Sequence, residues 1–154
     1  MNPINWLDNQ LLKLFDASAK KFHSLTDKDN FFLAKTVVLV WSLIDIAVGL
    51  PISAVALVSV FLFYSIYFCE VKAQREIRDE ASDTAIRERR RGLFLCRVFA
   101  DAVFIFSLGK YIRWQEGGLD MLQLAGFLTT AYLLSLDPPA SYKDRVLKET
   151  KEPA

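Results

Sequence analysis

The fold is decided by residues 31–69, which read FFLAKTVVLVWSLIDIAVGLPISAVALVSVFLFYSIYFC. Only two side chains in this stretch are charged, Lys35 and Asp45. A helix needs about 20 mostly apolar residues to cross the hydrocarbon core of a bilayer, so the stretch is long enough for two crossings. A Gly-Leu-Pro sequence at 49–51 divides it, because glycine ends a helix well and proline suits the first turn of the next one. The sequence therefore predicts membrane spans on both sides of this turn, over 31–49 and 51–69.

Two further apolar blocks follow, at 93–112 and 119–136, and thirteen of the 22 residues at 70–91 are charged. This segregation of apolar and charged blocks excludes a single soluble core and also a disordered chain. We expect an all-α membrane protein with four transmembrane helices, an N-terminal amphipathic helix and a cytoplasmic helical hairpin that extends the second and third spans. The predicted units are a cytoplasmic helix over 1–30, a transmembrane domain over 31–137 with a stalk at 70–92, and a cytoplasmic tail over 138–154.

The distribution of lysine and arginine predicts the orientation. Four of these residues precede the first span, seven lie in the middle segment and four in the tail, which makes 4 + 7 + 4 = 15 on one side against 2 on the other. Basic residues in short loops are retained on the cytoplasmic side. The first thirty residues do not read as a cleavable signal peptide. We therefore expect a multi-pass protein of the cell inner (plasma) membrane with both termini in the cytoplasm.

The charged middle segment has three interpretations: a solvated loop, a positively charged patch on the membrane surface, and a helical hairpin. Its six acidic and seven basic residues nearly cancel, which suits helix-stabilising pairs better than attraction to anionic lipid or nucleic acid. The cluster Ser82-Asp83-Thr84 can form the turn and cap the second helix. A turn at this position would place Cys69 opposite Cys96, and Glu76 opposite Arg89 and Arg90.

The first thirty residues contain an apolar stripe at helical spacing, formed by Ile4, Leu7, Leu11, Leu14, Phe15, Phe22 and Leu25 together with Ser18. One interpretation is a helix lying in the plane of the inner leaflet. The other is docking against the stalk or a partner protein, and here Leu7, Leu11, Phe15 and Phe22 are the candidate docking residues. The nearly neutral polar face adds little electrostatic attraction to lipid.

Ionisable side chains at membrane depth are rare, and each is a candidate functional residue. A rise of about 1.5 Å per residue places Lys35, Arg97 and Asp101 within about 12 Å of the cytoplasmic edge. We call these three residues the inner cluster. Asp45, Lys110 and Gln123 lie about 20 to 25 Å deep by the same reasoning and form the outer cluster. The structural interpretation is that paired charges fix which helices pack together, and the functional one is an ion or proton pathway centred on Asp101.

The residue inventory argues against catalysis. One histidine, His23, and two cysteines, Cys69 and Cys96, offer no metal-ligand spacing, and phosphate-binding glycine loops and nucleophile motifs are lacking. We expect no metal, no cofactor, no enzymatic activity and no nucleic-acid partner. The preferred function is a non-catalytic subunit or scaffold of an inner-membrane assembly, whose partners are the lipid bilayer and either other subunits or further copies of itself. The alternatives are a small ion-coupled transporter or channel that uses Asp45 and Asp101, and a membrane-perturbing, pore-forming effector of defence or lysis.

Overall fold

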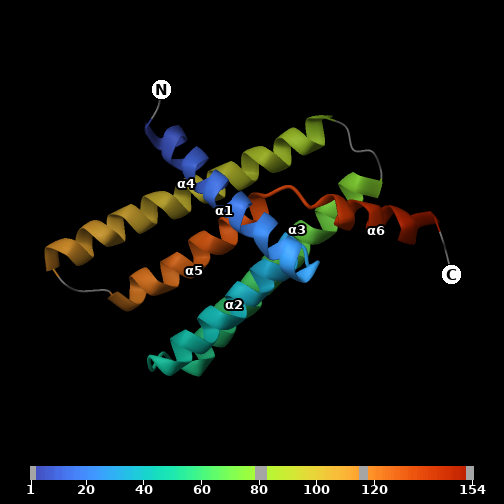
Figure 1. Ribbon diagram of the computed structural model, residues 1–154. Coiled ribbons are helices and arrows are strands. Elements are labelled where there is room, and N and C mark those ends of the chain that lie inside the picture. The colour runs from blue at the N-terminus through green and yellow to red at the C-terminus, as the bar shows by residue number, and fades with distance from the viewer. Residues whose placement is uncertain (1–2, 79–82, 115–117, 152–154) are drawn as a thin grey trace.

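The computed structural model consists of six α-helices over the residues that it describes, which are 3–78, 83–114 and 118–151 (Figure 1). In chain order the helices are α1 (Pro3–Thr26), α2 (Asn30–Ala47), α3 (Ile52–Arg78), α4 (Asp83–Trp114), α5 (Gly118–Ser135) and α6 (Ala140–Lys151). Among the described residues, three segments are long and apolar enough to cross a membrane: Asn30–Ala47, Ile52–Arg78 and Arg89–Gly109. The prediction of an all-helical protein with helices long and apolar enough to span a membrane is therefore confirmed, and the fourth span stays a prediction.

The turn between α2 and α3 forms where the sequence predicts it. Gly49 adopts a left-handed conformation with a φ of 91°, which glycine accepts without steric cost. Its N–H donates to the carbonyl of Ile46 at 3.0 Å, and the N–H of Leu50 donates to the carbonyl of Asp45 at 3.0 Å. These two bonds satisfy carbonyls that the end of a helix leaves without partners. The Pro51 carbonyl then accepts the first hydrogen bonds of α3.

The helices form a row in which α5 packs between α4 and α2, and α2 packs in turn against α3. Figure 1 shows α1 lying across α4 and α5, and α6 continuing away from the end of the row where α2 begins. The turn between α2 and α3 lies at the opposite end, as does the C-terminal end of α4 (Figure 1). The α6 helix packs against α3.

Two contacts hold α2 against α5, one at Gly126 and one at Asn30. A Cβ atom at Gly126 would lie 2.5 Å from Cδ1 of Trp41, so only glycine lets the indole approach α5 this closely. At the C-terminal end of α5, the side-chain amide of Asn30 donates to the carbonyls of Leu133 and Leu136, each at 3.1 Å. The first residue of α2 therefore caps the last turn of α5, and both contacts fix the register of the two helices.

Both flanks of the predicted hairpin are helical, because α3 continues to Arg78 and α4 begins at Asp83. The expected ion pair between Glu76 and Arg89 is present, with 2.9 Å between Oε2 and Nε. Arg90 instead pairs with Asp137 at 3.4 Å, so its expected position opposite Glu76 is corrected.

The remaining length of α4 packs against α5 and α1, whereas α3 packs against α2 and α6. The turn itself, at 79–82, lies outside the described residues.

Candidate functional site

One site withdrawn from solvent joins three helices around a buried arginine. Arg97 of α4 donates from Nε and Nη2 to the two carboxylate oxygens of Asp8 on α1, at 2.8 and 3.0 Å. Only 7% of Arg97 and 3% of Asp8 are exposed. Two parallel hydrogen bonds between guanidinium and carboxylate are among the strongest polar contacts in proteins. This pair therefore holds α1 onto α4.

Tyr132 of α5 connects this pair to a second carboxylate. Its hydroxyl lies 3.0 Å from Oδ1 of Asp8 and 2.8 Å from Oδ2 of Asp101. A phenol has one proton, so it donates to one of these carboxylates at a time. Asp101 is 5% exposed, and its Oδ1 has no hydrogen-bond partner. Asp8, Arg97, Asp101 and Tyr132 together form what we call the Tyr132 network.

Aromatic contacts enclose the network. The ring of Phe15 on α1 stacks on the ring of Tyr132, with centroids 5.1 Å apart and planes inclined by 15°. The Arg97 guanidinium carbon lies 5.6 Å from the centroid of Tyr132 and 5.8 Å from that of Phe94. A cation near aromatic rings is attracted by their negative faces. These rings keep water away from the charges and strengthen the interactions between them.

The inner cluster predicted from the sequence is partly corrected. Arg97 and Asp101 are linked through Asp8 and Tyr132, but Lys35 belongs to a different contact. The Nζ atom of Lys35 lies 2.7 Å from Oε2 of Glu70 on α3. The physical reason is the order of the row, because α5 separates α2 from α4.

Sequence analysis missed Asp8, Tyr132 and Glu70 as members of these contacts. Asp8 lies one helical turn before Leu11 and Leu12, which places its carboxylate on the packed side of α1. That position was the available signal, since an acid beside an apolar stripe on a helix near an intramembrane arginine is a candidate partner. Tyr132 gave no signal of its own, because an aromatic residue in an apolar block is usually part of the core.

The outer cluster converges on a cavity. Asp45 and Gln123 both line a cavity of about 550 Å³ between α2, α3, α4 and α5. The Asp45 carboxyl oxygen Oδ1 is shielded from solvent and has no hydrogen-bond partner. The side chain of Lys110, the third predicted member, lies outside the described residues. We call this space the Asp45 cavity.

The four candidate docking residues of α1, which are Leu7, Leu11, Phe15 and Phe22, are all half-buried by contacts within the protein. Their helix packs against α5, α2 and α4. Trp6, Leu14 and Leu25 remain exposed, by 50%, 61% and 76%. The predicted stripe is therefore divided between residues that the protein covers itself and the exposed Leu14 and Leu25, and Trp6 outside the stripe is exposed as well.

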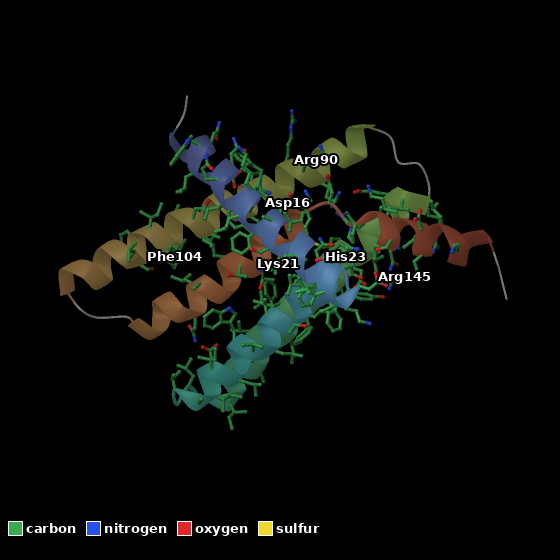
Figure 2. All side chains as sticks on the ribbon, in the orientation of Figure 1. Asp16, Lys21, His23, Arg90, Phe104 and Arg145 are labelled. Carbon is green, nitrogen blue, oxygen red and sulfur yellow. The ribbon has the colours of Figure 1, made fainter. Side chains whose placement is uncertain are left out.

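The end of α1 is tied to α6 through His23, which Figure 2 labels where the two helices approach each other. Its Nδ1 lies 3.1 Å from the Lys28 carbonyl, and its Nε2 lies 3.2 Å from Oγ of Ser141. With its two ring nitrogens engaged in this way, His23 acts as a connector between helices.

Comparison with protein families, with curated proteins and with solved structures gives no match for this chain. Within the described residues, no three side chains of histidine, cysteine, aspartate or glutamate gather where they could hold a metal ion. Function is therefore inferred from the geometry of the Tyr132 network, the Asp45 cavity and the exposed surfaces.

Proposed function

We propose that the protein is a non-catalytic integral membrane subunit or scaffold, which binds its partners through the cytoplasmic helices α1 and α6. The observation that carries this proposal is that charged side chains near the predicted cytoplasmic edge form ion pairs between helices. Lys35 pairs with Glu70, and Arg97 pairs with Asp8. Each of these ion pairs joins two helices, which is the role expected of charges that fix packing. A protein that carries ions would instead need such groups to line a polar path.

The uncovered part of α1 is the proposed docking surface. Trp6, Leu14 and Leu25 are large apolar side chains on a helix that the Arg97–Asp8 pair already holds in place. Since the helix is anchored by these internal contacts, its exposed side chains are free to bind a partner. Exposed apolar groups on a surface rimmed by charge commonly mark protein–protein contacts.

The proposal includes a topology. We propose that α5 is a fourth span beside α2, α3 and α4 in the cell inner (plasma) membrane. Both termini would be cytoplasmic, and the ends of α3 and α4 would project into the cytoplasm as a short hairpin. The basic asymmetry of 15 against 2 supports this orientation. The Glu76–Arg89 pair supports the hairpin.

The test uses the size of the complex extracted from its native membrane in mild detergent. Replacing Leu14 and Leu25 together by serine should release the partner and reduce the measured mass, while helix content stays constant. Replacing the exposed Lys13 and Ser24 by alanine in the same helix is the matched control and should leave the mass unchanged. An unchanged mass in the Leu14/Leu25 variant would contradict the docking surface.

The mass of the extracted complex, together with ion conduction in liposomes, separates the alternatives. A complex made only of many copies of this chain would favour the pore-forming effector. A monomer or dimer that conducts ions in liposomes would favour the transporter or channel.

A further inference from the structure

The Asp45 cavity has the size of a small-molecule site. Its volume of about 550 Å³ falls within the range of roughly 300–1,000 Å³ that is usual for ligand pockets in proteins. Most of its lining is apolar and includes Val38, Leu62, Leu124 and Phe127. Of the lining residues that the structure describes, only Asp45 has an ionisable side chain. A mostly apolar space with one carboxylate is suited to an apolar ligand that carries one positive charge.

The hydroxyl groups of the cavity wall also favour a cation. Thr130 donates to the carbonyl of Gly126 at 2.9 Å, and of Ser42 and Ser59 one donates to the other while the other donates to a backbone carbonyl of its own helix at 2.7 Å. A hydroxyl has a single proton, so a group that has already donated it presents lone pairs to its surroundings. The hydroxyls of Ser42 and Ser59 lie 2.6 Å apart and share a hydrogen bond, so both of their protons are engaged within the wall.

Aromatic rings in the cavity wall also favour a cation. Trp41 and Phe127 line the same space, and aromatic faces attract organic cations. Asp45 lines this space, so its carboxylate can pair with a positively charged group there. A single metal ion would leave most of this volume empty, whereas an aromatic or branched amine would fill it.

We propose that the Asp45 cavity binds hydrophobic organic cations, with the ammonium group of the ligand beside the Asp45 carboxylate and its apolar part against Trp41 and Phe127. This binding site is independent of the scaffold function proposed above. It assigns to the outer cluster a role in recognition, in addition to any contribution to helix packing.

The experiment titrates the full-length protein in lipid nanodiscs with benzyltrimethylammonium, using isothermal calorimetry with empty nanodiscs as the blank. Its uncharged isostere, in which a carbon atom replaces the nitrogen, is the control ligand. We expect saturable binding of one cation per chain and binding of the isostere that is weaker by at least about tenfold, because only the cation pairs with the carboxylate. Equal binding of the two ligands would overturn the proposal.

Two variants locate the site. Asp45→Asn removes the charge with little change in shape and should weaken cation binding by at least about tenfold, to the level of the isostere. Asp144→Asn makes the same change on the exposed surface of α6 and should leave binding unchanged. Cation binding that survives Asp45→Asn would overturn the proposal.

If Asp45→Asn fails to fold, Ser59→Leu decides the question, because it fills the cavity and keeps the carboxylate. Circular dichroism monitors the helix content of each variant. Loss of cation binding in folded Ser59→Leu protein supports the proposal, and retention at the wild-type affinity overturns it.

Discussion

At the scale of single residues, the Tyr132 network contains two carboxylates and one guanidinium, and these carboxylates have different tasks. Asp8 holds the Arg97 charge through two hydrogen bonds, whereas Asp101 contacts the neutral Tyr132 hydroxyl. Removing the partner of a buried charge leaves that charge uncompensated, which is more costly than removing a carboxylate from a neutral donor. The two acids are therefore expected to respond differently to the same substitution.

We expect Asp8→Asn to destabilise the protein by about 3 to 5 kcal/mol, as is usual when a buried ion pair loses one partner. Asp101→Asn should cost clearly less, because an amide can still accept the hydrogen bond from Tyr132. The free energy of unfolding in mixed micelles, measured by titration with a denaturing detergent, checks the order. The double variant Asp8→Asn with Arg97→Met should recover much of the loss, and an equal loss in both single variants would contradict this assignment.

The close approach of Trp41 to Gly126 leads to a second prediction. Gly126→Ala places a methyl group 2.5 Å from the Trp41 ring, so the ring or the helix has to move. Overpacking of this kind costs about 1 to 3 kcal/mol. Gly92→Ala is the matched control, since a Cβ there meets nothing within 4 Å. Unfolding of the two variants under the same conditions checks the difference, and equal stabilities would show that Trp41 does not pack on Gly126.

The residue scale also shows what sequence analysis could and could not predict. Arg97 and Asp101 could be identified, because a charge in an apolar block is conspicuous and the two lie one turn apart. The ion pair of Lys35 with Glu70 could not, because counting depth along helices says nothing about which helices are neighbours. Depth reduces the number of possible partners, and the lateral order of the helices then chooses among them.

At the scale of elements, α1 combines features that the sequence treated as alternatives. It lies across the row of helices, as an in-plane helix would, and it also docks, but against the protein's own α5, α4 and α2 (Figure 1). The period of its apolar stripe predicted the helix correctly. The buried face is rotated relative to the stripe, because the pairing of Asp8 with Arg97 directs that side of α1 inward. An ion pair between distant elements overrides a pattern that counts only apolar groups.

The attachment of α6 to α3 should depend on pH. Burial raises the pKa of Tyr142 to about 12 from 10.0, and the nearby acids Glu70 and Asp29 act in the same direction, while Gln74 and Arg145 oppose it. A group whose pKa is raised by folding stabilises the folded state below its unfolded pKa and loses this contribution as the pH rises. The contribution of Tyr142 should therefore be complete below pH 10 and disappear between about pH 10 and 12.

Comparison with Tyr142→Phe isolates this effect, because the variant keeps the ring beside Phe31, 5.7 Å away between centroids, and lacks the titrating hydroxyl. We expect the stability difference between wild type and variant to change in favour of the variant over this alkaline range. Denaturing-detergent titrations at a series of pH values measure it. A difference that stays constant with pH would show that Tyr142 does not titrate on unfolding.

At the scale of the whole molecule, the row of helices explains why local sequence signals were sufficient for the elements and insufficient for their arrangement. The turn at Gly49 and the start of α2 at Asp29 are local, since glycine and an aspartate cap act within one turn. The position of α5 between α2 and α4 is a property of side chains far apart in sequence, such as Asn30 with Leu133 and Trp41 with Gly126. No periodic pattern within one helix encodes such a choice of neighbour.

The orientation of this row in a membrane provides the last prediction. α6 lies at the end where α2 begins, and the turn between α2 and α3 lies at the opposite end (Figure 1). Reporters at Ala154 and beside Leu50 should therefore be on opposite sides of the bilayer. Because basic residues favour the side of the termini by 15 to 2, a fluorescent protein fused at Ala154 should fluoresce, and alkaline phosphatase inserted after Leu50 should be active.

Exchanging the two reporters is the control and should silence both. Since the basic residues are divided among three segments on one side, replacing Lys143, Arg145 and Lys148 by glutamine removes only part of the asymmetry and should leave the orientation unchanged. Active phosphatase at Ala154 would reverse the orientation and place α1 and α6 outside the cytoplasm. The proposed docking surface on Trp6, Leu14 and Leu25 would then have to bind a partner outside the cytoplasm, so this measurement decides where such a partner is sought.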